Sequence, residues 1–421
     1  MMKIAKNDLK ETLGIAQATL GNGPDITSHF LFEKVGSEVF VSACNPPRIY
    51  SSIPLKGCKV EEVKTESEEG DEVEVGFQPF TLEGKRVIQA INAVDGLLTI
   101  TLNEGSVKIT SDKGVLELSS LDPSAFPPWR DMLAGAGEMA STPANLLADT
   151  LTLSKPFMST DETRRPELAQ VYFTNGMAFS CDGFGLSMAK SDSFKDLEVK
   201  FHLKDVAPAT KFLKAHDGHA MSVLSSDKAV FLKAEDGAVF GMMEVPFDMP
   251  KPITQKYIDA FDWTPRRVWR IKKDDFANAL NFLSSGADED NLKVNLIDSE
   301  EESLSPPRLE MTSSNSKVIS YNLDPVELSF DLTDDLDLNL IEDLGERLFA
   351  SRALQDKKGE TEGDDIGSFS FNISYMRRSL DVTSNVITFG CNREGEKRGY
   401  MLFKQATESG AVVVSILGWM V

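Results

Sequence analysis

The sequence predicts an α+β protein built from three similar domains, each with two helices packed on antiparallel sheets. Three stretches carry this prediction because they share one pattern: Phe-x-aliphatic, a short amphipathic helix with basic residues, a turn pair, and then apolar-rich strands. They run from Phe80 to Gly96, from Phe201 to Gly218, and from Phe371 to Asn385. Each is preceded by another helix and strands, so each third of the 421 residues repeats one order. The expected domains are 1–135, 136–262 and 263–421.

The first domain opens with a helix that Asn7 or Asp8 can cap and that Gly21-Asn22-Gly23-Pro24 ends. The acidic residues 61–75 predict a solvated loop. The helix of the first Phe-led stretch follows. Strands are expected over 29–34, 38–44, 48–55, 97–102, 106–111 and 115–121.

The second domain repeats this order. Ser141 or Thr142 is expected to cap its first helix, with Pro143 early in that helix. Asn175-Gly176 predicts a tight hairpin, and Asp182-Gly183 predicts another turn. Strands are expected over 169–174, 177–180, 186–189, 219–224, 229–234 and 238–245.

The third domain starts at 267–273, and Phe276, Leu280 and Leu283 then recur at i, i+4 and i+7. An acidic segment at about 331–365 breaks the pattern and is expected to be an insertion. The remaining strands are expected over 292–297, 308–312, 317–323, 386–391, 400–405 and 411–417.

Composition restricts the partners that the chain can bind. Lys and Arg number 44 against 66 Asp and Glu, which gives a net charge of -22. An evenly charged surface of this sign repels DNA, so any nucleic-acid contact must be local. The four cysteines show no C-x-x-C spacing, the N-terminus lacks an apolar signal core, and no apolar run approaches the ~20 residues of a membrane span. These features favour a reduced, cytoplasmic setting.

Positive charge gathers on or at the ends of the predicted helices. If their apolar faces lie on the sheets, their polar faces share one space and form a basic concave surface. Such a surface holds a polyanion through phosphate contacts that read no bases. The DNA-facing residues predicted on this basis are Lys6, Lys10, Lys85, Arg86, Lys204, Lys211, Lys214, Lys272, Lys273, Arg377 and Arg378.

Three segments and their order resemble the β sliding clamp family of bacterial DNA polymerase III, in a divergent and possibly phage-encoded form. The segments are Val171 to Met177, Phe371 to Tyr375, and Leu116 to Leu121 with Phe126-Pro127 after it. The resemblance extends over nearly the whole chain as a pattern. It implies three clamp-type domains in a head-to-tail dimeric ring that encircles double-stranded DNA, independently of sequence, and tethers a replicative polymerase.

The resemblance also implies two sets of contact residues. By position, Leu116, Leu118, Phe282 and Leu283 match the family's dimer interface, although ordinary core packing explains them equally well. The pocket that binds short peptide motifs of polymerases and clamp loaders matches Thr174, Cys181, Gly183, Phe184, Gly185, Leu186, Pro250, Leu417, Trp419 and Met420.

This pocket departs from the family pattern. Phe184-Gly185 stands where the family usually has His-Arg, and the C-terminal tail lacks the family's Met-Pro-Met-Arg. We therefore expect an apolar groove of altered specificity, because a lost Arg removes a hydrogen-bonding fork while Phe and Trp add stacking area. Phe184 and Trp419 are alternatively simple packing aromatics.

No catalytic group, cofactor or metal site is predicted. Asp335-x-Asp337-x-Asn339 with Glu346 copies the spacing of an EF-hand loop, but Leu340 stands where that loop needs Gly. Asp182-Gly183-Phe184-Gly185 is too short for a phosphate loop, and the four His residues have no ligand spacing. Two other functions stay open: a scaffold that reuses such domains without enclosing DNA, and a hydrolase that holds metal in the acidic insertion.

Overall fold

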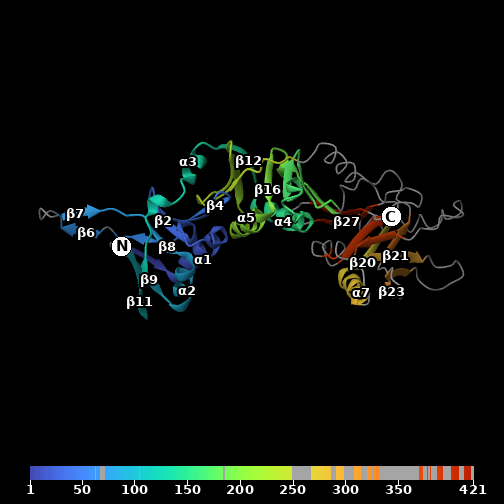
Figure 1. Cartoon of the computed structure of the whole chain (residues 1–421), viewed down its shortest axis with the longest axis horizontal. Helices are drawn as coiled ribbons and strands as arrows, with labels where there is room; N and C mark the ends of the chain where they lie inside the picture. Colours follow the sequence, from blue (N-terminus) through green and yellow to red (C-terminus); the bar gives the residue numbers. More distant parts are fainter. Residues whose placement is uncertain are drawn as a thin grey trace. The chain divides into compact units, whose positions relative to one another are not determined.

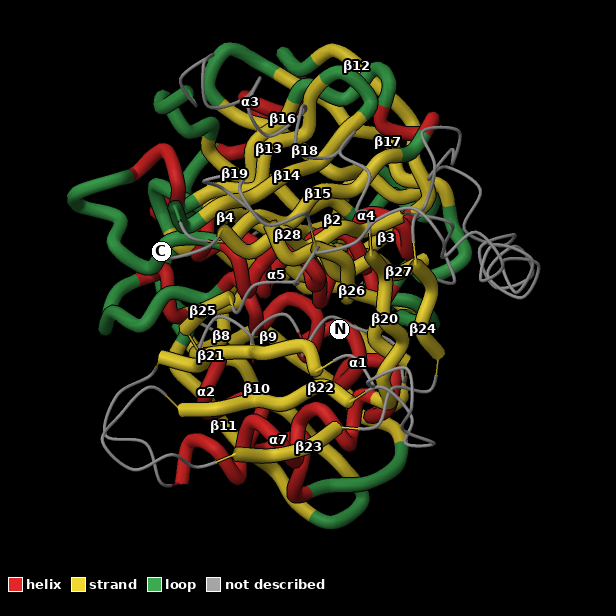
Figure 2. Tube along the Cα trace, turned by 90° about the vertical axis from the view of Figure 1, so that its right-hand side faces the viewer, coloured by secondary structure: helices red, strands yellow, loops and turns green. Residues whose placement is uncertain are grey.

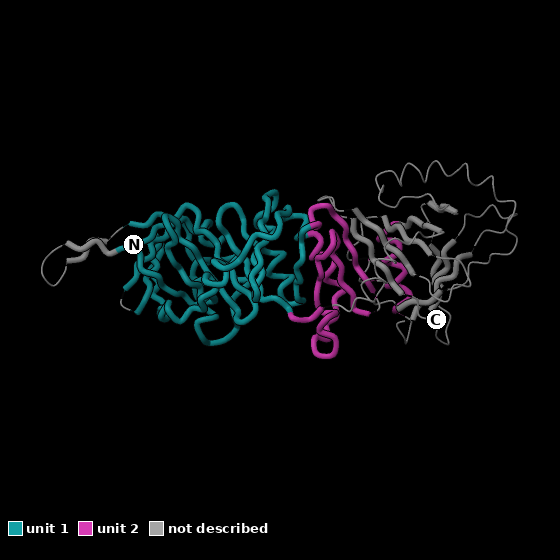
Figure 3. The backbone as a smooth tube through the Cα atoms, turned by 90° about the horizontal axis from the view of Figure 1, so that it is seen from above, with its two compact units in different colours: residues 1–148, 196–245 teal, residues 149–195, 246–421 magenta. Residues whose placement is uncertain are grey.

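A computed structural model describes residues 1–61, 63–66, 72–103, 105–183, 185–248, 267–285, 291–297, 308–313, 320–323, 327–330, 369–372, 377, 380, 386–391, 400–406 and 412–418. The chain divides into two compact units (Figure 3). Unit 1 comprises Met1–Ala148 and Asp196–Val245, and unit 2 comprises Asp149–Lys195 and Pro246–Val421. In the described part of the chain, no helix is long and apolar enough to cross a membrane.

One motif recurs along the described residues: a strand, a helix, and three antiparallel strands, which we call a module. Modules 1 and 2 are β1 (Met2–Ala5), α1 (Lys6–Ala16), β2 (His29–Val35), β3 (Glu38–Asn45) and β4 (Ile49–Pro54), then β8 (Phe80–Glu83), α2 (Gly84–Ala93), β9 (Leu97–Asn103), β10 (Ser106–Ser111) and β11 (Gly114–Ser119). Modules 3 and 4 are β12 (Gly137–Pro143), α4 (Ala144–Ser154), β13 (Gln170–Thr174), β14 (Met177–Cys181) and β15 (Gly185–Lys190), then β16 (Val199–His202), α5 (Leu203–Ala215), β17 (Ala220–Ser225), β18 (Ala229–Ala234) and β19 (Val239–Met243).

Modules 5 and 6 follow the same order. They are β20 (Arg267–Lys272), α7 (Lys273–Ser285), β21 (Asn291–Ile297), β22 (Arg308–Ser313) and β23 (Ser320–Leu323), then β25 (Phe369–Asn372), β26 (Val386–Cys391), β27 (Tyr400–Ala406) and β28 (Val412–Gly418). Of the helix expected in module 6, Arg377 and Leu380 are described, and both are helical. The repeat predicted from the Phe-led stretches is therefore present, with each Phe-led tripeptide at or before the start of a helix.

Shorter elements lie within the modules or between them. They are β5 (Lys59–Val60), β6 (Val63–Glu66), β7 (Glu72–Val75), β24 (Glu327–Phe330), the helix α3 (Trp129–Ala134), and the 3-10 turns Gln17–Thr19, Ile26–Ser28, Pro123–Ala125, Lys155–Phe157, Pro166–Leu168 and Asp192–Phe194.

Unit 1 contains two antiparallel sheets. The first strand of module 1 belongs to the sheet of module 2, and the first strand of module 2 belongs to the sheet of module 1. One sheet has the order β11-β10-β9-β1-β5, and the other has the order β12-β17-β18-β19-β4-β3-β2-β8. Thus β1 pairs with β9 of module 2, while β8 pairs with β2 of module 1. The β4–β19 pairing makes the second sheet continuous between strands of the first and second predicted domains.

Unit 2 repeats this arrangement. One sheet contains the order β13-β14-β15-β28-β27-β26-β20-β24, and the other has the order β23-β22-β21-β25. Here β20 pairs with β26 and β25 pairs with β21, the same exchange of first strands. Helix α7 packs on β22 and β23 (Figure 2). Its buried residues include Phe276, Ala279 and Leu280.

Three local expectations were wrong, each for a physical reason. Helix α1 begins at Lys6 without a side-chain cap, because the Lys6 N–H donates to the carbonyl of Gly96 at 3.0 Å. Pro143 ends β12 instead of entering α4, and β12 is an edge strand, where proline is tolerated. Part of 61–75 forms the β6–β7 hairpin, because its Val and Thr residues alternate with the charged ones.

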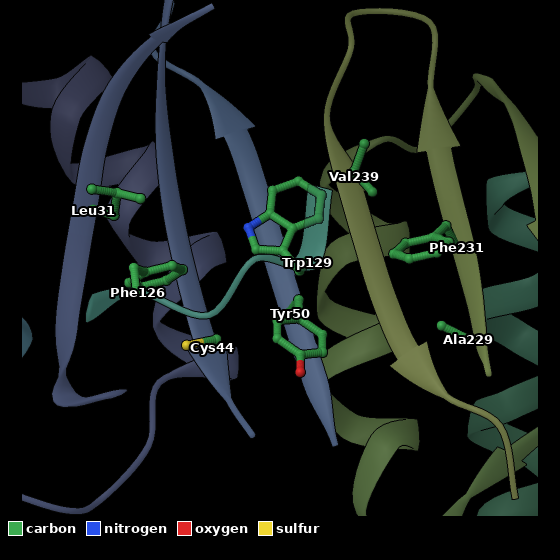
Figure 4. Close-up of a cluster of buried hydrophobic side chains, with 8 residues drawn as sticks. All are labelled: Leu31, Cys44, Tyr50, Phe126, Trp129, Ala229, Phe231 and Val239. Carbon is green, nitrogen blue, oxygen red and sulfur yellow. The ribbon is translucent and has the colours of Figure 1, made fainter. Parts of the chain in front are cut away.

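The core of unit 1 is continuous across the β4–β19 junction. Two of its members there, Trp129 and Phe126, come from the segment after β11 and pack with residues of β2–β4 and β18–β19 (Figure 4). Arg130 extends this packing because its guanidinium lies 4.7 Å from the centre of the Trp129 ring and pairs with Glu33.

Candidate nucleic-acid interface and partner surfaces

The helices α1, α2 and α5 form one layer in unit 1 (Figure 1). Helix α1 is the middle member, since it packs against α2, α5 and the strands β3 and β4. Each helix buries one apolar face; the buried residues include Leu9 and Leu13 on α1, Val87 on α2, and Phe212 and Leu213 on α5. This is the amphipathic spacing that the sequence predicted, and it leaves the opposite faces in solvent.

The exposed side of this layer is rich in cations. The three helices contain seven Lys or Arg residues and three acidic ones, the reverse of the excess of acids in the whole chain. Six of the cations are exposed: Lys10, Lys85, Arg86, Lys204, Lys211 and Lys214. The layer is therefore a local positive surface within a chain of net charge -22.

Lys6, the seventh cation, is less available than predicted. Its Nζ lies 2.8 Å from Oδ1 of Asp95, and its side chain is 18% exposed. Asp95 also binds Lys113 at 3.1 Å, and these two lysines lower the pKa of its carboxyl. Arg86 is exposed but makes a 2.8 Å contact with Glu83 one turn away. Both contacts reduce the positive field at the starts of helices α1 and α2.

The acid on α5 points inward. The Asp205 side chain is 0% exposed and forms a bidentate pair with Arg48, whose Nε donates to Oδ1 at 2.8 Å and whose Nη2 donates to Oδ2. Burial raises the pKa of Asp205 to about 6, although the Arg48 guanidinium opposes this shift. Because Asp205 is covered, the solvent face of α5 presents Lys204, Lys211 and Lys214 and no acid of that helix.

The other described helices lack this surplus of positive charge, although the sequence predicted basic residues on or at the ends of the helices in all three domains. Lys272 ends β20 and Lys273 begins α7, but Asp274 and Asp275 follow directly, and both are exposed. Helix α4 contains one acid and no cation. Arg377 is exposed and donates to Asn281 and Ser284 of α7 at 3.0 and 2.6 Å, while Arg378 lies outside the described residues.

The predicted dimer-interface residues differ in what they offer a second chain. Leu116 is half-buried on β11, the edge strand of its sheet, and its neighbour Val115 is 61% exposed. Phe282 of α7 is 50% exposed. Leu118 and Leu283 are buried within the chain, and Leu283 is 0% exposed, so these two side chains have almost no free surface.

The described residues of the predicted peptide pocket lie on strands β13, β14, β15 and β28 of unit 2 and in the turn between β14 and β15. Cys181 and Leu186 are buried directly opposite each other on β14 and β15, and Gly185 pairs with Leu417 of β28. Thr174 is half-buried at the end of β13. Phe184, Pro250, Trp419 and Met420 lie outside the described residues.

Side-chain hydrogen bonds help to hold the turn between β14 and β15. Asp182 Oδ1 accepts from the Gly185 N–H at 2.7 Å, and Cys181 Sγ accepts from the Gly183 N–H at 3.1 Å. Gly183 has a φ of +96°, which side-chain-bearing residues rarely adopt, so glycine is required there. The turn predicted at Asp182-Gly183 is confirmed.

Two structural features were missed from the sequence. The Arg48–Asp205 pair joins residues 157 positions apart, and no local pattern signals such a contact. Trp129 was assigned only to a proline-rich exit segment, although its position beside Phe126 was a usable signal of burial. Among the described residues no group of His, Cys, Asp or Glu is arranged to hold a metal ion, and the EF-hand-like spacing at 335–346 lies outside them.

No protein-family model and no curated protein matches the sequence. Solved structures match over the full chain. The DNA polymerase sliding clamp from Bacillus subtilis has a TM-score of 0.70 at 14% identity, with 100% of this chain and 98% of that chain covered. The β subunit from DNA polymerase of Streptococcus pyogenes has a TM-score of 0.72 at 14% identity, with 100% and 99% covered.

A third match supports the same conclusion. The DNA polymerase III β subunit from Thermotoga maritima has a TM-score of 0.68 at 16% identity, with both chains covered completely. At these identities the similarity establishes the fold. The chain thus has the fold of bacterial sliding clamps, which confirms the α+β class and the fold that the sequence resemblance implied.

Proposed function

We propose that the chain is a DNA sliding clamp, a processivity factor that encircles duplex DNA and tethers a replicative polymerase. The observation that carries the proposal is the layer of α1, α2 and α5, whose solvent side is cationic in a strongly acidic chain of clamp fold. Exposed Lys and Arg attract phosphates of any sequence, while the acidic remainder repels them. Among the helices that the structure describes, this layer therefore provides the contact with DNA, and the contact is weak.

The mechanism is topological and needs no catalytic group. A closed ring cannot dissociate from circular DNA, so weak phosphate contacts suffice and sliding is not hindered. The proposed ring is a head-to-tail homodimer, in which an edge strand of one chain meets a different edge of the other. We assign these edges to β11, with Leu116, and to the β23 side of unit 2, where α7 presents Phe282.

The proposed partners are double-stranded DNA, a DNA polymerase and a clamp loader. The proteins bind through short peptides at the β14–β15 surface that contains Cys181 and Leu186. The proposed setting is the cytoplasm, which agrees with free thiols at Cys44, Cys58 and Cys181. The three domains 1–135, 136–262 and 263–421 remain part of this proposal.

Charge reversal tests the DNA contact. The double variant K211E/K214E reverses two exposed cations of α5 and should lower retention on circular DNA. It should also reduce the salt dependence by roughly 0.9 in log–log slope for each phosphate that is no longer neutralised. The matched control is K228E/K233E, which reverses two exposed lysines, one just before β18 and one on it. Equal effects in both variants would show a general charge effect and would count against the proposal.

Solution mass and an interface variant test the ring. We expect a dimer of twice 46.3 kDa that the double variant L116D/F282D converts to a monomer. That variant should also abolish long-product synthesis on primed circular DNA. A dimer that never stays on circular DNA would instead favour the scaffold function.

A further inference from the structure

We propose that His216, Asp236 and Lys56 form a proton-dependent latch at the junction of the first two predicted domains. When His216 is protonated, the latch holds the C-terminal end of α5 more firmly against the turn between β18 and β19. The latch lies entirely within unit 1, and it operates whether or not the chain encircles DNA.

His216 is a buried residue directly after the last turn of α5. Its backbone N–H donates to the carbonyl of Leu213 at 3.0 Å, and its ring packs against Phe212 with the ring centres 4.6 Å apart. Only 6% of the residue is exposed, so water does not supply its partners. The groups that face its two ring nitrogens therefore decide which protonation state is favoured.

The partner of Nδ1 fixes the neutral tautomer of His216. Nδ1 lies 2.8 Å from the carbonyl oxygen of Phe212. A carbonyl oxygen can only accept a hydrogen bond, so Nδ1 must carry a proton. In the neutral ring, Nε2 therefore has a lone pair and no hydrogen.

Nε2 faces a carboxylate across the domain surface. It lies 3.6 Å from Oδ1 of Asp236, which is too far for a normal hydrogen bond. In the neutral ring, a nitrogen lone pair and a carboxylate oxygen face each other, and neither atom can donate. Protonation of Nε2 supplies the missing hydrogen and converts this contact into a charge-assisted hydrogen bond.

Asp236 is held in place as an anion by two other donors. Lys56 Nζ lies 2.9 Å from Oδ2, and the Ala238 N–H donates to Oδ1 at 3.1 Å. Burial raises the pKa of Asp236, but the hydrogen bonds outweigh burial, so this pKa lies below its ordinary value of 3.8. Asp236 therefore stays ionised over the range in which histidine side chains change charge, about pH 5 to 8.

The other charged groups around His216 act through solvent. Lys56 opposes the protonation of His216, but its side chain is 75% exposed and its field is screened. His219 lies 4.0 Å from Glu235, and these two side chains are 60% and 72% exposed. The remaining charged neighbours along the chain are also exposed, and they are Lys214 and Asp217. Asp236 is thus the partner that decides the state of His216.

The latch lies at one end of the strand ladder that joins the two predicted domains. Lys56 follows β4 in the first domain, whereas Asp236 precedes β19 in the second, and β4 pairs with β19. The turn at Asp236 also rests on the first domain, since a Cβ on Gly237 would lie 3.6 Å from the Phe40 ring. A firmer His216–Asp236 contact therefore fixes α5 to both domains.

The two ends of α5 respond to acid in opposite directions. Near its start, Asp205 pairs with Arg48 of the first domain, and this pair is lost when Asp205 becomes neutral. At its other end, protonation of His216 creates a hydrogen bond. Acidification therefore shifts the anchoring of α5 from its first turn to its last, next to the exposed Lys214.

Amide hydrogen exchange of residues 209–219 in the full-length chain tests the latch. Rates are measured by mass spectrometry at about pH 5.5 and about pH 7.5 and corrected for intrinsic exchange. H216Q has no titratable group at this position, so the ratio of its rate to the wild-type rate should be at least about threefold larger at the lower pH. Comparison of two chains at the same pH cancels the effect of Asp205, which both contain.

D236N and H219Q complete the experiment. D236N removes the carboxylate and keeps His216, so it should show the same rise in the ratio, and it decides the question if H216Q does not fold. H219Q is the matched control because it removes an exposed histidine three residues away, and its ratio should be the same at both pH values. A ratio independent of pH in a folded H216Q or D236N chain, or an equal rise in H219Q, would overturn the proposal.

Discussion

The buried pair between Arg48 and Asp205 makes a strong prediction about the stability of α5. Arg48→Met keeps the length and much of the apolar contact of the side chain but removes its charge and both hydrogen bonds. Asp205, which is 0% exposed, would then be a buried carboxylate without its partner. Breaking a buried pair from one side costs about 3–5 kcal/mol, and because Arg48 is 27% exposed we expect about 3 kcal/mol.

The direction of the pH dependence follows from the pKa of Asp205. Its folded pKa of about 6 lies above the ordinary value of 3.8, so folding disfavours the charged form. This cost is fully present above the folded pKa and disappears as the pH falls toward 3.8, where the carboxyl is increasingly neutral in both states. Loss of Arg48 removes the group that opposes the rise in the pKa of Asp205. The loss of stability in R48M should therefore be large at about pH 7 and much smaller at about pH 5.

Amide hydrogen exchange of α5 measures this effect locally. A decrease of about 3 kcal/mol in opening free energy speeds exchange about a hundredfold at about pH 7, after correction for the intrinsic rate. The control R48M/D205N carries no charge at either position, so its exchange should be slower than that of R48M and should vary less with pH. An R48M effect below about fivefold at neutral pH, or equal at about pH 5 and about pH 7, would refute the reasoning.

Two further predictions concern packing and thiol reactivity. A Cβ on Gly241 would lie 2.7 Å from two carbons of the Phe231 ring. Gly241→Ala should therefore lower the free energy of unfolding by about 1–3 kcal/mol, as measured by thermal unfolding. Gly114→Ala, which meets no atom within 4 Å, should change stability by less than about 0.5 kcal/mol, and equal changes would contradict the packing argument. Burial raises the pKa of the half-buried Cys58 to about 11 and that of the buried Cys44 to about 12, so mass-mapped alkylation should label Cys58 first. Faster labelling of Cys44 would show that its burial is transient.

Much of the fold was predictable because its units are local and repeated. The apolar spacing of each helix predicted the buried faces, as in Val206, Ala209 and Phe212 of α5. The Asn175-Gly176 turn was also readable, since Asn175 and Gly176 both adopt positive φ in the hairpin. What the sequence did not reveal is the exchange of first strands between modules, because strand pairing across many residues leaves no local periodicity.

The candidate sites were predicted less completely than the fold. Charge counting identified the exposed cations of α1, α2 and α5, because surface charge follows directly from composition and amphipathic spacing. It could not show that Lys6 is bound by Asp95 or that Leu283 is buried, since both depend on neighbours that only folding brings close. The general lesson is that the face of a helix is readable from sequence, whereas the partner of a side chain is not.

The uneven distribution of cations bears on how tightly such a protein can hold DNA. If the six exposed cations on the unit 1 layer all reach phosphates, this layer contributes a log–log slope of roughly 5 per chain to the salt dependence of binding. Helix α4 has no cation and α7 has two acids next to its lysine, so these helices add little attraction. A clamp that gripped DNA with every helix would bind more strongly but would slide less freely. In the proposed clamp, confining the positive charge of the described helices to one layer would give a weak, sequence-independent hold, and retention would come from closure of the proposed ring.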